Sequence, residues 1–178
     1  MRKVINAIFR RLNEKFLAQK TERLATNVVY KGKEEIATCL LFYVAGAEPF
    51  EAKKVLKNSL PHVQLKQLCF VPLDRRVIEE ADVVYYYHKE LTWKGHLPNE
   101  QLGEMLSRKF DLLVDLTDRS NVLTQYVLKN SQACCIVGRK SKESFADIMI
   151  DGVKDESDFV MKLVTLLAEI NGYDHGKI

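Results

Sequence analysis

Long apolar segments are absent from this sequence of 178 residues. No apolar run approaches the ~20 residues of a membrane-spanning helix. The first residues also lack the uninterrupted apolar stretch of a secretory signal. The apolar share of 47% is ordinary for a globular protein with a core. We therefore expect a cytoplasmic protein with about one domain.

The residues that usually mark metal and phosphate chemistry are few and scattered. The four cysteines form no C-x-x-C pair and fall within apolar, strand-like runs, which predicts buried, reduced thiols. The histidines have no metal-ligand spacing. No G-x-x-x-x-G-K-[ST] or G-x-G-x-x-G motif is present. The sequence therefore predicts no metal site and leaves any cofactor unknown.

Positive charge is concentrated at the amino terminus. Residues 1–24 carry seven Lys or Arg against two Glu, a net charge of +5; because the whole chain carries +3, the remainder carries −2. This near-neutral body makes nucleic acid an unfavoured partner. Apolar residues at intervals of three or four predict that the segment is a basic amphipathic helix, separate from a single α/β domain over 25–178. That helix packs on the body, contacts a protein partner or a second copy of the chain, or lies on an anionic membrane surface.

The stretch from Lys109 to Lys140 has the pattern of one βαβ unit. Phe110–Leu116 and Ala133–Val137 are near-continuous apolar runs, typical of strands covered on both faces. Helical spacing between them predicts a right-handed parallel crossover. Further strands are expected over 36–45, 65–72, 82–88 and 145–150, and further helices over 51–60, 99–107 and 159–170. Leu73–Glu80 is expected to be a charged connection, with or without one helical turn. We expect a three-layer, Rossmann-like α/β domain with a mostly parallel sheet of five or six strands.

The turn after Phe110–Leu116 is the first candidate site, because ligands of open parallel sheets bind beyond the carboxyl ends of the strands. The free N–H groups that begin the next helix favour an anion there. Asp115 and Asp118 would orient a ligand or a metal, and Arg119 would pair with its anion. Thr117 and Ser120 complete the set. In the alternative interpretation, Asp118, Ser120 or Asn121 only caps the helix and Arg119 is solvated.

A second group of candidates lies around the irregular stretch Leu91–Pro98. His88 or His96 would be the proton carrier of an enzyme, because the unperturbed pKa of histidine is ~6.5. Trp93 is the single tryptophan of the chain. It either forms part of a ligand lid or contact surface, or it plugs the end of the core.

Four short segments carry a resemblance to a known family. They are DLLVDLT (Asp111–Thr117), NSQA (Asn130–Ala133), the corner Val137–Arg139 and LTWKG (Leu91–Gly95). In these the chain resembles an uncharacterised bacterial family of small α/β proteins over most of residues 25–171. The resemblance implies a fold but no activity. A looser likeness, from DLLVDLT to IVGRK, is to the N-terminal Rossmann-like half of heptosyltransferase-type glycosyltransferases. Those enzymes need a second such domain, so the likeness speaks against a complete transferase.

Two functions follow from these patterns. The first is a non-catalytic binding or interaction protein, because no nucleophile–base pair, metal cluster or phosphate loop is visible in the sequence. The second is a small enzyme or ligand-binding domain for an anionic metabolite, such as a nucleotide or sugar phosphate, at the carboxyl ends of the strands.

Overall fold

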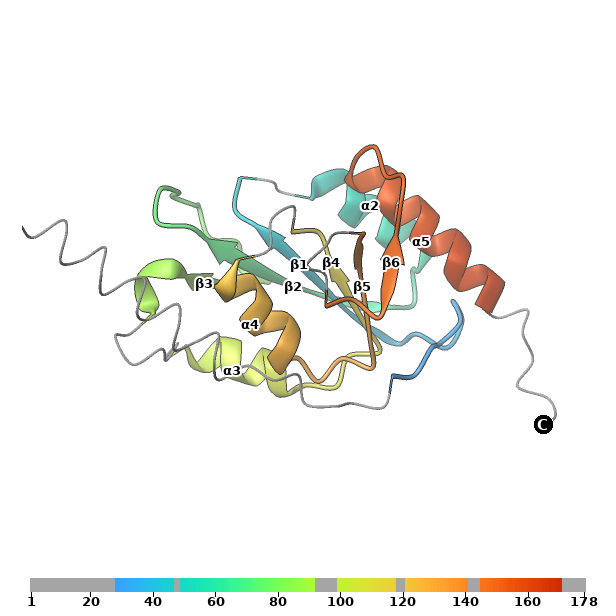
Figure 1. Ribbon diagram of the computed structural model, residues 1–178, viewed down its shortest axis with the longest axis horizontal. Coiled ribbons are helices and arrows are strands. Elements are labelled where there is room, and N and C mark those ends of the chain that lie inside the picture. Colours follow the sequence, from blue (N-terminus) through green and yellow to red (C-terminus); the bar gives the residue numbers. More distant parts are fainter. Residues whose placement is uncertain (1–27, 47–48, 92–98, 118–120, 141–144, 171–178) are drawn as a thin grey trace, which may run out of the picture.

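One parallel sheet organises the part of the chain that the computed structural model describes, residues 28–46, 49–91, 99–117, 121–140 and 145–170. Its strands are β1 (Thr38–Val44), β2 (Gln64–Val71), β3 (Val83–Tyr87), β4 (Leu112–Asp115), β5 (Cys135–Arg139) and β6 (Ile148–Ile150). Their order across the sheet is β3-β2-β1-β4-β5-β6 (Figure 1), and every pair is parallel. This confirms the predicted Rossmann-like α/β sheet.

Helices cover both faces of the sheet. They are α2 (Phe50–Ser59), α3 (Glu100–Ser107), α4 (Val122–Asn130) and α5 (Glu156–Ile170), with a short 3-10 helix at His88–Glu90. The pair α2 and α5 packs on one face, and α3 and α4 pack on the other (Figure 1). Leu40 and Leu41 face opposite layers, yet neither side chain is exposed. Burial on both faces is the reason these strands have continuous rather than alternating apolar sequences.

The connection from β2 to β3 contains no helix. Residues 72–82 contain a turn near each end and no regular element between them, so the helical turn left open for Leu73–Glu80 does not form. Two tyrosines of β3 hold this segment. The Glu80 N–H donates to the Tyr85 hydroxyl at 3.2 Å, and the Tyr87 hydroxyl donates to the Glu79 carboxylate. Because this connection is short, the α2/α5 face of the sheet near β3 is covered by a loop instead of a helix.

The structure selects one of the three predicted caps of α4 and shortens the predicted final strand. Asn121 is the N-cap of α4: its Oδ1 accepts from the N–H groups of Leu123 and Thr124 at 2.9 and 3.0 Å. The final strand is shorter than the predicted 145–150 and begins at Ile148. Asp147, just before it, bonds to β5 through both backbone and side chain: its N–H donates to the Ile136 carbonyl and its carboxylate accepts the Ile136 N–H, both at 2.8 Å.

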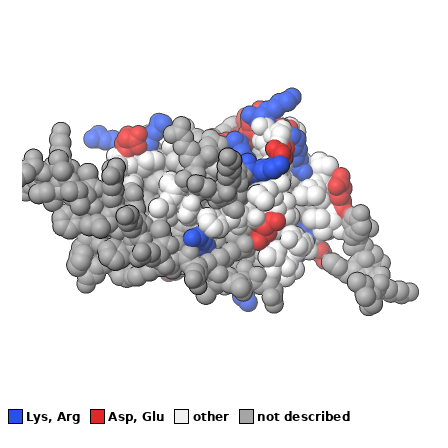
Figure 2. All heavy atoms as spheres, in the orientation of Figure 1, with Lys and Arg blue, Asp and Glu red and all other residues white. Residues whose placement is uncertain are grey.

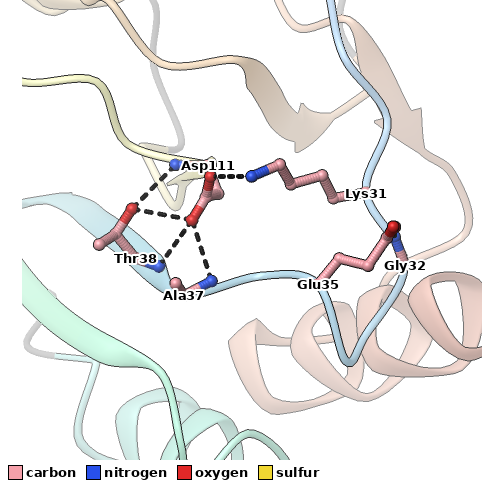
Figure 3. Close-up of polar contacts among 6 residues, drawn as sticks. All are labelled: Lys31, Gly32, Glu35, Ala37, Thr38 and Asp111. Carbon is pink, nitrogen blue, oxygen red and sulfur yellow. Dashed lines mark hydrogen bonds and ion pairs between the residues drawn. The ribbon is translucent and has the colours of Figure 1, made fainter.

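Asp111 joins the beginnings of β1 and β4 (Figure 3). Its Oδ2 accepts from the Ala37 N–H, the Thr38 N–H and the Thr38 hydroxyl at 2.9, 2.9 and 3.0 Å. Its Oδ1 pairs with Lys31 Nζ at 2.5 Å. Burial raises the pKa of this carboxyl, but the hydrogen bonds from Lys31, Ala37 and Thr38 outweigh it and hold the pKa below the usual range. The cluster lies at the amino edge of the sheet, opposite the candidate site, and its groups satisfy one another.

The amphipathic helix predicted over residues 1–24 lies outside the described residues, and so do the partner, membrane and domain-boundary predictions that depend on it. Among the helices that the structure describes, none is long and apolar enough to cross a membrane.

Candidate functional site

The strand order reverses between β1 and β4, whose carboxyl ends lie side by side at one edge of the sheet. β1 is hydrogen-bonded to β2 on one side and to β4 on the other, so the ends of β1 and β4 leave toward different layers. In open parallel sheets, ligands bind in the crevice that this reversal creates. Gly46 follows β1 at this edge, and Asp115 ends β4.

Asp115 and Thr117, two of the predicted site residues, lie together. The Thr117 N–H donates to Asp115 Oδ1 at 3.0 Å, and Asp115 is only 9% exposed. Asp115 lies opposite Gly138 of β5, where an added Cβ would be 3.7 Å from Asp115 Oδ2. Its charge also acts on Tyr86, since burial and then Asp115 raise the pKa of that hydroxyl well above its ordinary value. Asp115 is thus enclosed on the α3/α4 side of the sheet.

The structure does not bring His88 to Asp115. β3, which precedes His88, is separated from β4 by β2 and β1. Three strand spacings place the ends of β3 and β4 roughly 14 Å apart. The His88 ring instead lies beside Phe70, with centroids 6.2 Å apart. The remaining predicted site residues, Trp93, His96, Asp118, Arg119 and Ser120, lie outside the described residues.

A cavity of about 280 Å³ opens at the carboxyl ends of β2 and β3. Its walls come from the β2–β3 connection, the end of β3 and the 3-10 helix, on the α2/α5 side of the sheet. The apolar part of the lining is Val71, Pro72, Leu73, Val77 and the Tyr87 ring; the charged part is Arg75, Arg76 and Lys89. All three charged lining residues are cations, so the cavity is suited to an anion.

Arg75 links this cavity to the end of β1. A turn fixes its backbone, because the Arg75 N–H donates to the Pro72 carbonyl at 3.2 Å. Its guanidinium packs on Gly46: an added Cβ there would lie 2.9 Å from Nη1 and 3.0 Å from Cζ. Gly46 has a φ of +89°, which side-chain-bearing residues rarely adopt. Gly46 therefore supplies both the turn after β1 and the space that the guanidinium occupies.

Tyr87 and Lys89 form another part of the cavity lining. Lys89 Nζ lies 4.4 Å from the centre of the Tyr87 ring, a cation–π contact. The hydrogen bond to Glu79, followed by burial and the charges of Glu79 and Glu90, raises the pKa of the Tyr87 hydroxyl to about 12. This hydroxyl is therefore neutral at physiological pH and serves to hold the ring, not to carry a proton.

The sequence analysis missed Arg75, Arg76, Tyr87 and Lys89. A signal was available, because the rule that ligands bind beyond strand ends applies to Pro72–Arg76 after β2 as it does to Thr117–Ser120 after β4. The first of these segments was predicted only to be a charged connection. Within the described ranges, no group of three or more His, Cys, Asp or Glu residues is placed to hold a metal ion.

Comparison with known proteins gives a family but no activity. No curated protein matches the chain, and no solved structure matches it. The model of one protein family, described as a family of unknown function (DUF6913), matches residues 10–170. This confirms the resemblance to an uncharacterised family of small α/β proteins. The match spans most of the chain, and the protein belongs to this family of unknown function.

Proposed function

We propose that this protein is a non-catalytic, cytoplasmic binding protein whose ligand is a small phosphate-bearing molecule held at the carboxyl edge of the sheet. The observation that carries the proposal is the cavity lined by Arg75, Arg76 and Lys89. Arginine forms paired hydrogen bonds with phosphate oxygens, and lysine adds a point charge. The position also agrees with the general location of ligand sites in open α/β sheets.

The positive charge of the cavity is local. On the face shown in Figure 2, basic and acidic side chains are interspersed over the described surface, and no broad area has one sign. A wide basic surface would favour nucleic acid. A small basic cavity on a mixed surface favours a compact anion.

A binding role is favoured over an enzymatic one by the residues around the cavity. Its charged groups are two guanidiniums and one ammonium, and the neighbouring Tyr87 hydroxyl has a pKa of about 12. This hydroxyl therefore stays protonated near neutral pH, and the described cavity lining includes no carboxylate, histidine or cysteine side chain. His88, predicted from the sequence as a proton carrier, and Asp115, predicted to orient a ligand or a metal, lie toward the other layer of the sheet.

The test is ligand-induced thermal stabilisation with inorganic phosphate, pyrophosphate and a panel of phosphate-bearing metabolites. A ligand at 100 times its dissociation constant adds about 2.7 kcal/mol, or roughly 5–11 °C in a chain of this size. We expect Arg75→Gln to remove the shift. Arg108→Gln is the matched control, since Arg108 is exposed at the end of α3, at the opposite edge of the sheet. If no ligand shifts the wild type, or if both variants bind equally, the proposal is refuted.

A further inference from the structure

We infer that the ligand of this cavity is a free nucleoside monophosphate: one aromatic base, one sugar and one phosphate. The inference rests on the proposed function and adds the identity of the part of the ligand that is not phosphate. Three features of the cavity carry it: its size, its division into an apolar and a cationic part, and a fixed aromatic ring.

The cavity size limits the ligand. Its volume of about 280 Å³ lies just below the ~300–1,000 Å³ typical of small-molecule pockets. A complete dinucleotide cofactor would need the upper part of that range. Inorganic phosphate alone would leave most of this space filled with water against apolar walls. A ligand of intermediate size fits both limits.

The two parts of the lining demand two kinds of ligand group. Arg75, Arg76 and Lys89 suit a phosphate. The remaining walls are apolar, and Leu73 is 54% exposed to solvent although it lines the cavity. A sugar phosphate would leave this apolar surface covered by hydroxyl groups. A planar, weakly polar base would remove it from water.

Tyr87 supplies a ring that is already held in place. Its hydroxyl donates to Glu79, and Lys89 lies over its ring at 4.4 Å. An aromatic side chain ordered before binding loses little conformational entropy when a base packs on it. Base–aromatic stacking contributes ~1–3 kcal/mol and tolerates any base. The base would thus lie against Tyr87 and the phosphate beside Lys89, two residues that contact each other.

The experiment compares dissociation constants by titration calorimetry. The probes are adenosine and uridine monophosphates, ribose 5-phosphate, inorganic phosphate, adenosine and a short 5′-phosphorylated RNA. We expect both monophosphates to bind at least tenfold more tightly than ribose 5-phosphate. Tyr87→Leu should remove that advantage, so that the monophosphates and ribose 5-phosphate bind this variant about equally. Tyr87→Phe keeps the ring and should retain most of the advantage of the monophosphates. Leu73→Ser should weaken binding of the monophosphates without a risk to the fold, because Leu73 is largely exposed.

The outcomes separate this inference from the proposed function. Equal binding of ribose 5-phosphate and the monophosphates overturns the ligand class and leaves the phosphate site standing. Binding of adenosine that is as tight as that of its monophosphate and insensitive to Arg75→Gln overturns the phosphate site. Tighter binding of the RNA than of either monophosphate overturns the free-nucleotide inference. If none of the probes binds the wild type, both proposals fail.

Discussion

Replacing Asp111 with alanine should destabilise the fold more than any other single change of a charged residue discussed above. The carboxylate accepts four hydrogen bonds, from Lys31, Ala37 and twice from Thr38, and its side chain is 13% exposed. Ala37 is exposed, so water replaces the carboxylate as the hydrogen-bond partner of its N–H at little cost. The two Thr38 groups are half-buried and together contribute about 1–2 kcal/mol. The ion pair with Lys31 contributes only ~0–1 kcal/mol, because the Lys31 side chain is 32% exposed and water screens its charge.

The sum predicts that Asp111→Ala lowers the free energy of unfolding by about 1–3 kcal/mol, measured by urea denaturation at neutral pH. The melting temperature should fall by roughly 2–12 °C. Asp151→Asn is the matched control. Asp151 also pairs with a lysine, Lys140, at 2.7 Å, but that pair is exposed, and we expect no change in its denaturation midpoint. If Asp111→Ala unfolds at the same urea concentration as this control, the account of the cluster is wrong.

Two further measurements test the cause. Asp111→Asn keeps one oxygen for the Thr38 and Ala37 donors but turns an amide toward the Lys31 ammonium. The Asn substitution should therefore cost less in a Lys31→Met background than in the wild type, which a double-mutant cycle measures. The pH dependence follows from the lowered pKa of Asp111. Its contribution is complete above the unfolded pKa of ~3.9 and is lost as the pH falls through the lower folded pKa. Asp111→Asn should therefore flatten the acid limb of the stability curve below about pH 4.

The remaining predictions concern glycines and a helix cap. Gly46→Ala should lower stability by about 1–2 kcal/mol, because φ is +89°, and should also weaken phosphate binding, because the new Cβ would displace Arg75. Gly103→Ala, in α3 with no atom within 4 Å of the added Cβ, should instead stabilise by about 0.4–1 kcal/mol; a loss of stability would contradict the packing described for α3. Asn121→Ala should cost about 1 kcal/mol by removing the N-cap of α4, whereas Asn121→Asp should be nearly neutral, both measured by urea denaturation.

The described strands and helices, apart from some of their ends, and the fold class were predictable from the amino-acid sequence. Apolar runs such as Phe110–Leu116 identify strands buried on both faces, because neither face of a covered strand can be polar. Helices between such runs imply parallel crossovers with a fixed hand. Local chemistry also placed Asn121 among the residues able to cap α4, since capping involves only neighbouring residues. These inferences depend on interactions within a few residues or on simple periodicity.

Contacts between residues far apart in the sequence depend on the tertiary structure. Lys31 and Asp111 are 80 positions apart and pair because β1 and β4 are neighbours in the sheet. Arg75 reaches Gly46 because β1 and β2 are parallel neighbours whose ends meet at one edge. His88 does not reach Asp115, because two strands lie between β3 and β4. Hydrophobic periodicity identifies a strand and its buried faces but carries no information on strand order, and the location of the cavity depends on that order.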